Sequence, residues 1–276
     1  WTRDFLFYLS VDPILRKNYH DQLTLSTLYA YSEHYILTLG SRDVGSLEEF
    51  MAKLPGDDKH KLAQVREAYS YMMVHPGCKM MAPGAAIPEG LAKCIQALNT
   101  LYKSSPALYQ MDDEYDGFEW VQLMKYEENV ITFLRKTEKP EETLLVICNF
   151  AAIPYENYQV GVPFAGKYKE IFNSDAVEFG GEGVVNSRVK TAKAEECDER
   201  EHSIKVKLPA LGVSIYSCTP GKAPARKKVT AAKTAKDKTA KDKTAGKLVR
   251  TVKAKTPAKK SVKEEKATKV EEAVKA

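Results

Sequence analysis

The sequence has 276 residues, 43% of them hydrophobic, and a formal net charge of +5. This length and apolar content allow one or two globular cores. Every apolar run is shorter than the roughly 18 residues of a membrane-spanning helix, and no basic and apolar signal segment opens the chain, so we expect neither a membrane protein nor one secreted by such a signal. The chain begins with Trp1 rather than Met, and we therefore expect a fragment or a processed product.

Five cysteines lie far apart in the sequence, and none forms a C-x-x-C pair or a His/Cys group with the spacing of a zinc site. An odd number of scattered cysteines is typical of free thiols in a reducing compartment. We therefore expect a cytoplasmic protein with no metal site, and no motif indicates a cofactor.

Helices and strands are predicted to alternate in the first hundred residues. A helix should follow Asp21, and the β-rich run 35–39 should form a strand that ends at Gly40. The further predicted elements are a capping box at 46–49, a helix over 58–74, a short buried strand at 79–82 and a helix from Pro88 to about Ser105. Such alternation indicates parallel β/α units, which are too few here to bury a sheet and would belong to a larger barrel.

From about Asp112 the pattern changes to short β-rich runs separated by turn residues. The predicted strands are 118–125, 130–135, 144–150, 158–162, 168–172, 204–208 and 213–216. This spacing predicts an antiparallel β-sandwich, which we expect to fold independently of residues 1–110.

The last segment of the chain is strongly basic. Residues 221–276 contain 19 Lys/Arg and six Asp/Glu and no aromatic residue, whereas the preceding part contains 23 Lys/Arg and 31 Asp/Glu. Near-repeats of Thr-Ala-Lys-Asp-Lys begin at Thr234 and Thr239. With little apolar surface to offset the entropy of ordering, residues 220–276 are predicted to be a disordered tail.

Dense sequence motifs run through residues 1–218. They are W-T-R-D-F-L-F-Y-L-S-V-D-P-I-L-R-K-N-Y-H-D-Q-L-T-L-S-T-L-Y at 1–29, K-L-P-G-D at 53–57, H-P-G at 75–77, L-N-T-L-Y at 98–102, G-F-E-W at 117–120, C-N-F at 148–150, G-V-P at 161–163, and N-S-D at 173–175 with F-G-G-E-G at 179–183. A chain with these motifs resembles the C-terminal portion of bacterial glycogen branching enzymes of the α-amylase superfamily. The resemblance implies that residues 1–110 are the last units of a (β/α)8 barrel and residues 111–219 an all-β domain.

Enzymes of this family transfer a segment of an α-1,4-glucan to a 6-hydroxyl group and so create an α-1,6 branch. The retaining reaction uses a carboxylate nucleophile, a carboxylic acid and a third carboxylate that stabilises the transition state. By the resemblance, the nucleophile and the acid precede Trp1, so neither is present and this chain alone is predicted to be inactive. The implied partners are α-glucan chains and the missing N-terminal half of the barrel.

The sequence departs from the family where the third carboxylate is expected. The family's Ser-His-Asp-Glu-Val is replaced by Gly40-Ser41-Arg42-Asp43-Val44. Without a gap, Arg42 replaces the catalytic Asp; with the Glu deleted, Asp43 is a remnant of it. Farther along, the family's Gly-Gln-Glu-Phe becomes the segment 84–87, Gly-Ala-Ala-Ile, and the polar loop after it is missing. These losses favour a paralogue that is inactive even when complete.

Several other residues have ordinary structural explanations. Asp43 beside Arg42 also fits a surface ion pair. The histidines at 20, 34, 60 and 75 lack metal spacing, and the Met pairs at 72–73 and 80–81 fit a flexible core. Glu33, Glu48 and Glu49 are poor candidates for a catalytic acid. The aromatic residues 115, 118, 120 and 126 are more often core than a sugar platform.

Two alternatives to a branching enzyme segment remain open. A non-catalytic glucan-binding or scaffolding paralogue would explain Arg42, Ala85 and Ala86. The basic tail would attract nucleic acid only non-specifically, since it has no aromatic residue to stack on bases.

Overall fold

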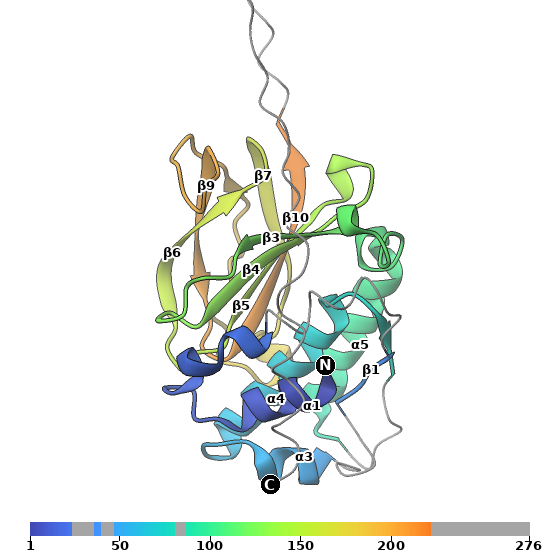
Figure 1. The fold of residues 1–276 in the computed structure, drawn as a ribbon, viewed down its shortest axis with the longest axis vertical. Helices are drawn as coiled ribbons and strands as arrows, with labels where there is room; N and C mark the ends of the chain where they lie inside the picture. Colours follow the sequence, from blue (N-terminus) through green and yellow to red (C-terminus); the bar gives the residue numbers. More distant parts are fainter. Residues whose placement is uncertain (24–35, 40–46, 81–86, 222–276) are drawn as a thin grey trace, which may run out of the picture. The chain divides into compact units, whose positions relative to one another are not determined.

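The computed structural model describes residues 1–23, 36–39, 47–80 and 87–221 (Figure 1). The described residues belong to one compact unit, Trp1–Ala225. Its α-helices are α1 (Thr2–Ser10), α3 (Leu47–Lys53), α4 (Asp58–Val74) and α5 (Glu89–Ser104). Short 3-10 turns are η1 (Arg16–Tyr19), η2 (Pro106–Leu108), η3 (Tyr115–Gly117), η4 (Pro140–Glu142) and η5 (Val177–Phe179). No helix of the described ranges is long and apolar enough to cross a membrane.

Helix α4 has the bounds that the sequence predicts. The Asp57 side chain caps its start by accepting a hydrogen bond from the His60 N–H at 2.9 Å. The helix ends before His75, and Gly77 follows with a φ of 112°, a conformation that favours glycine. The predicted helix at Pro88 is also confirmed as α5. Of the helix predicted after Asp21, residues 21–23 are helical, and the rest lies outside the described residues.

Helix α1 was not anticipated from the sequence. It buries Phe5, Tyr8 and Leu9, which recur at the i, i+3, i+4 spacing of one helix face. The residue that precedes the helix, Trp1, packs against the Phe5 ring with the ring centroids 4.9 Å apart. Burial of this face therefore offsets the entropy that the segment loses when it forms a helix. The caps of the helix contribute no side-chain hydrogen bond.

The β-rich part forms a six-stranded sheet and a two-stranded sheet, and the predicted antiparallel sandwich is confirmed. The strands are β3 (Phe118–Gln122), β4 (Val130–Arg135), β5 (Leu144–Asn149), β6 (Tyr155–Val162), β7 (Gly166–Asn173), β8 (Lys190–Thr191), β9 (His202–Leu208) and β10 (Gly212–Pro220). The large sheet has the order β3-β4-β5-β10-β7-β8, and β6 pairs with β9 in the small one. The two-residue strand β8 was missed because it is too short to show an alternating pattern.

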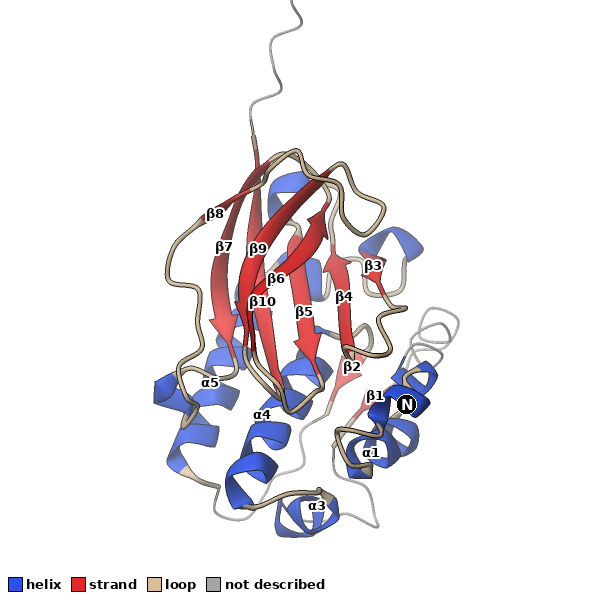
Figure 2. Cartoon of the chain, turned by 90° about the vertical axis from the view of Figure 1, so that its left-hand side faces the viewer, coloured by secondary structure: helices blue, strands red, loops and turns tan. Residues whose placement is uncertain are grey.

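Strands β4 and β5 are buried along their whole length because the large sheet is covered on both faces (Figure 2). Phe133 and Val146 face a core shared with the helices, while Leu134 and Leu145 face the core beneath β6 and β9. Neighbouring residues therefore point into different cores, as the period of two in a strand requires. The molecule has three layers: helices, the large sheet and the small sheet.

The helices and the large sheet share one hydrophobic core. Phe5 of α1 and Tyr71 of α4 lie against Phe150, with ring centroids 6.3 and 5.6 Å apart. The prediction that residues 111–219 fold independently is not tested by this packing, although removing the helices would expose one face of the sheet to water. The predicted boundary near residue 110 thus separates two kinds of structure that share a core.

Candidate functional site

Two short strands of the N-terminal part pair in parallel. Strand β1 (Ile36–Leu37) lies beside β2 (Cys78–Lys79), with Ile36 opposite Cys78, and the Met80 N–H donates to the Leu37 carbonyl oxygen at 2.8 Å. Both strands fall within predicted strands or at their edge. Because parallel strands end at the same edge of a sheet, the chain leaves both β1 and β2 on one side, where α/β folds place ligands.

The family's expected site segments follow these strand ends. Residues 40–46, which include Arg42 and Asp43, come soon after β1, and residues 81–86, which include Ala85 and Ala86, come soon after β2. All of them lie outside the described residues, so the proposed role of Asp43 stays a prediction. Ile87, the last residue of the altered motif, is exposed.

One face of the two-stranded parallel sheet is apolar and open. Ile36 and Met80 are 62% and 50% exposed, and Cys78, which lies opposite Ile36 in the register, is also exposed. On the other face, Leu37 is fully buried and Lys79 is largely covered. Parallel sheets are normally covered on both faces, so this open face is suited to further packing.

A charged cluster holds β2 against the β-rich part. The Asp112 carboxylate accepts hydrogen bonds from the Gly77 N–H at 2.8 Å, from the Lys79 Nζ at 3.5 Å and from the Arg135 guanidinium. Arg135 also donates to the carbonyl oxygen of Val74 at 2.7 Å. The cluster therefore ties the end of α4 and the start of β2 to strand β4.

Lys79 is the most unusual basic group of this cluster. Its side chain is 6% exposed, and its ammonium lies 4.8 Å from the centre of the Tyr102 ring. Burial lowers the pKa of Lys79 to about 8; the Asp112 carboxylate opposes the shift and the Arg135 charge adds to it. No motif marked Lys79, Asp112 or Arg135 in the sequence, because Asp112 lies 33 residues from Lys79 and 23 residues from Arg135.

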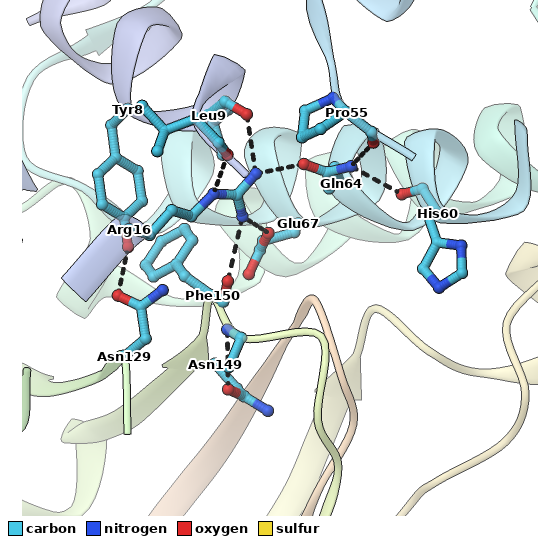
Figure 3. Close-up of polar contacts among 12 residues, drawn as sticks. Tyr8, Leu9, Arg16, Pro55, His60, Gln64, Glu67, Asn129, Asn149 and Phe150 are labelled. Carbon is cyan, nitrogen blue, oxygen red and sulfur yellow. Dashed lines mark hydrogen bonds and ion pairs between the residues drawn. The ribbon is translucent and has the colours of Figure 1, made fainter. Parts of the chain in front are cut away.

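A second buried network joins the N-terminal segment to both α4 and the sheet (Figure 3). The Arg16 guanidinium donates to the carbonyl oxygens of Leu9 at 2.8 Å and of Phe150 at 3.1 Å, and also to the Gln64 side chain. Arg16 lies within the D-P-I-L-R motif but carried no assigned role in the sequence. Its contacts make it an anchor between three segments.

Glu67 lies beside this anchor and is completely buried. The Arg16 Nη1 approaches its carboxylate to 4.0 Å, yet neither oxygen accepts a hydrogen bond within the described residues. Burial raises the pKa of Glu67 well above its usual value, and the Arg16 charge opposes the shift only in part. A carboxyl group sealed in this way cannot touch a substrate, so Glu67 is a structural group.

The histidines and aromatic residues that the sequence analysis considered as site candidates do not lie together in the structure. His20 and His75 are buried, and His60 is exposed beside Asp57 on the first turn of α4. Phe118 and Trp120 pack on Phe133 in the core, which confirms their interpretation as core residues. Tyr115 is 76% exposed and Tyr126 contacts His20, so the four aromatic residues form no common platform.

The candidate glutamates and the methionine pairs also lie in different parts of the structure. Glu48 and Glu49 lie exposed in the first turn of α3, while Met72 and Met73 are buried in the core. Glu33, His34 and Met81 lie outside the described residues. Among the residues that the structure describes, no group of three His, Cys, Asp or Glu side chains is arranged to hold a metal ion.

Comparison with known proteins matches both the architecture and the sequence. Residues 120–219 match the family described as alpha amylase, C-terminal all-beta domain. The 1,4-alpha-glucan branching enzyme GlgB of Oceanobacillus iheyensis is 35% identical over 238 residues, and that of Aquifex aeolicus is 37% identical over 238 residues. These matches cover 78% and 77% of the chain. The chain belongs to the branching enzyme family.

This member of the branching enzyme family spans 37% of the length of each of these relatives. A solved structure, the maltotriose complex of PulA from Klebsiella pneumoniae, has a similar fold, with a TM-score of 0.51 at 9% identity. The similarity covers 77% of this chain and 32% of PulA. At that identity the likeness concerns the fold alone.

Proposed function

We propose that this chain is the closing portion of a glucan-branching protein, in which further strands complete a (β/α)8 barrel next to β1 and β2. The observation that carries the proposal is the parallel β1–β2 pair, whose open face bears Ile36 and Met80. Two strands of two residues cannot form a stable parallel sheet by themselves. This chain matches 37% of the length of its relative from Oceanobacillus iheyensis, and the missing strands would come from a part of the protein that corresponds to the rest.

The proposed reaction is the transfer of an α-1,4-glucan segment to a 6-hydroxyl group during glycogen synthesis. It requires two carboxyl groups from outside this chain as nucleophile and acid, and Asp43 is the candidate for the third carboxylate. The chain itself would position the segments that follow β1 and β2. The proposed substrates are therefore α-glucan chains, and the five free thiols favour a reducing, cytoplasmic location.

A branching assay on the complete native protein tests this proposal. The protein would be incubated with amylose, and the new α-1,6 branches would be counted after treatment with a debranching enzyme. We expect branches from the complete protein and none from residues 1–276 alone. Asp43→Asn in the complete protein should lower kcat strongly, whereas Asp113→Asn, an exposed change in the segment before β3, should not.

A complete protein that makes no branch but binds amylose would instead be the non-catalytic glucan-binding paralogue. The replacement of family motif residues by Arg42, Ala85 and Ala86 favours that second function. Binding of amylose would be measured by affinity electrophoresis in gels with and without the polysaccharide. Absence of both branching and retardation would contradict both functions.

A further inference from the structure

A pocket of about 180 Å³ lies between α4 and three loops of the β-rich part. Lys59, His60, Ala63 and Arg66 line it from α4, where their spacing of three or four residues places them on one side of the helix. The opposite walls come from the β5–β6 connection, the loop 174–184 and the β9–β10 turn. The residues that line those walls are Ala152, Pro154, Asp175, Gly180, Glu182, Val184, Ala210 and Leu211.

The Arg66 guanidinium is the main donor in this pocket. The residue is only 6% exposed, and its Nε donates to the Ser174 carbonyl oxygen at 2.9 Å. Within the described residues, no acceptor is assigned to its Nη1 and Nη2 groups. A Cβ atom built on Gly180, which lines the pocket, would lie 3.9 Å from Nη1. Because Arg66 lines the pocket, these Nη groups are available to a ligand or to water.

The Asp175 carboxylate is the main acceptor. Its two oxygens accept hydrogen bonds from the Glu182 N–H at 2.9 Å and the Val184 N–H at 3.0 Å. Each carboxylate oxygen has a second lone pair for another donor. The loop is held in this shape by tight packing, since a Cβ on Gly181 would lie 2.2 Å from the Asp175 carbonyl oxygen. The donor and the acceptor are thus both preorganised.

The charge and the volume of the pocket indicate which kind of ligand it can hold. Arg66 and Lys59 are balanced by Asp175 and Glu182, and Lys59 forms an ion pair with Glu182 at the rim. Two carboxylates would repel a phosphate, whereas neutral hydroxyl groups can accept from a guanidinium and donate to a carboxylate. The volume exceeds that of one water molecule and lies below the roughly 300 Å³ of common drug-sized pockets.

We propose that this pocket binds the terminal sugar unit of an α-glucan, with neighbouring hydroxyl groups hydrogen-bonded to Arg66 and Asp175. The choice of sugar rests on the proposed glucan-branching function. The apolar side of the ring packs against Ala63 and Leu211. Because walls from four segments enclose the pocket, it takes a chain end rather than the middle of a chain.

The test is a glucose titration of the ¹⁵N-labelled 276-residue chain, followed by the amide signals of Glu182 and Val184. Glucose should shift both signals with saturation. Arg66→Lys should weaken glucose binding by about ten-fold or more, because an ammonium lacks the planar fork of a guanidinium. Ala152→Phe, an exposed change at the mouth, should abolish binding, whereas Ala194→Phe, an exposed change outside the pocket, should leave it intact.

Amide signals that stay unchanged in glucose, or that shift with inorganic phosphate and not with glucose, would overturn the proposal. Thermal unfolding of each variant shows whether a loss of binding reflects a loss of folding. If Arg66→Lys is unfolded, glucose binding by Ala152→Phe decides whether the sugar occupies the pocket. The branching assay on the complete protein is separate. Branching without a glucose response would overturn the sugar pocket alone, and a glucose response without branching would overturn the proposed function alone.

Discussion

The Arg135 guanidinium donates a hydrogen bond to the carbonyl oxygen of Val74 at 2.7 Å. Arg135 is the last residue of β4, and Val74 is the last residue of α4. The bond satisfies a carbonyl group at the end of a helix, where intrahelical partners run out. Since the same guanidinium pairs with Asp112, it joins the helical layer, strand β2 and the sheet at one point.

Replacing Arg135 with Met should destabilise the protein by about 3 kcal/mol. The change leaves the partly buried Asp112 carboxylate without its guanidinium partner, and breaking a buried ion pair from one side is costly. The measurement is urea unfolding followed by circular dichroism. Arg3→Met is the control, because the Arg3 side chain is 95% exposed. Equal stability of the two variants would show that the cluster adds nothing to the fold.

A chain of residues 111–221 should be poorly folded without the helices. The side chains of Phe133 and Phe150, which face the core shared with α1 and α4, would be exposed to water. We expect strong binding of the dye ANS and self-association in analytical ultracentrifugation, with residues 1–221 as the reference. A monomeric fragment that unfolds cooperatively and binds no dye would restore the expectation of an independent β-domain.

Acid should destabilise the protein through His75. Burial lowers the pKa of His75 to about 3, so between roughly pH 6.5 and pH 3 the unfolded chain binds a proton that the folded chain does not. The contribution of His75 to stability is therefore complete above pH 6.5 and is lost as the pH falls. From pH 7 to pH 5 the loss should be about 2 kcal/mol.

The check is urea unfolding of His75→Phe at both pH values. Phenylalanine does not titrate and suits a site between the rings of Trp1 and Tyr71. The difference in unfolding free energy between pH 7 and pH 5 should shrink in this variant and persist in His60→Gln, which changes an exposed histidine. A pH dependence that His75→Phe leaves intact would assign the acid sensitivity to other groups.

Gly90→Ala should destabilise the protein although it lies in a helix. Alanine is favoured over glycine in helices by about 1 kcal/mol, but a Cβ on Gly90 would lie 2.6 Å from the Phe179 carbonyl oxygen. We expect a net loss of about 2 kcal/mol from this overpacking, measured by thermal unfolding. Gln96→Ala, on an exposed position of the same helix, should be neutral or slightly stabilising. A higher melting temperature for Gly90→Ala would show that η5 can move away.

Local signals explain which elements could be predicted from the sequence. Helix α4 has an Asp57 cap and a Pro76-Gly77 stop, and strand β4 has an uninterrupted run of β-forming residues. Helix α1 shows the spacing of a helix face but carries no side-chain cap, so it was missed. Strand β5 is apolar except for Asn149, so its sequence shows no alternation; the structure shows it, because the two faces of the strand contact different cores.

The candidate sites depended on contacts across long stretches of chain. The sequence directed attention to the segments after the predicted strands, where Asp43 is still a prediction. No sequence signal marked the Arg66 pocket. Ser174, whose carbonyl oxygen accepts the Arg66 hydrogen bond, lies 108 residues from Arg66, and the family motifs at 173–183 show no partner in the sequence.

The sequence by itself determined the family, the change from α/β to all-β structure near residue 110, and the place of most elements, with exact bounds for α4 and β4, because these depend on local periodicity, capping and turn residues. Only the tertiary structure decided that the helical part and the β-rich part share a core and that Arg16 and Arg135 form hydrogen bonds between them. It also decided that Arg66 and Asp175 line the same pocket. Such contacts depend on how helices and sheet pack in three dimensions, and residues 61 to 134 positions apart, such as Arg135 and Val74 or Arg16 and Phe150, leave no local pattern that reveals this packing.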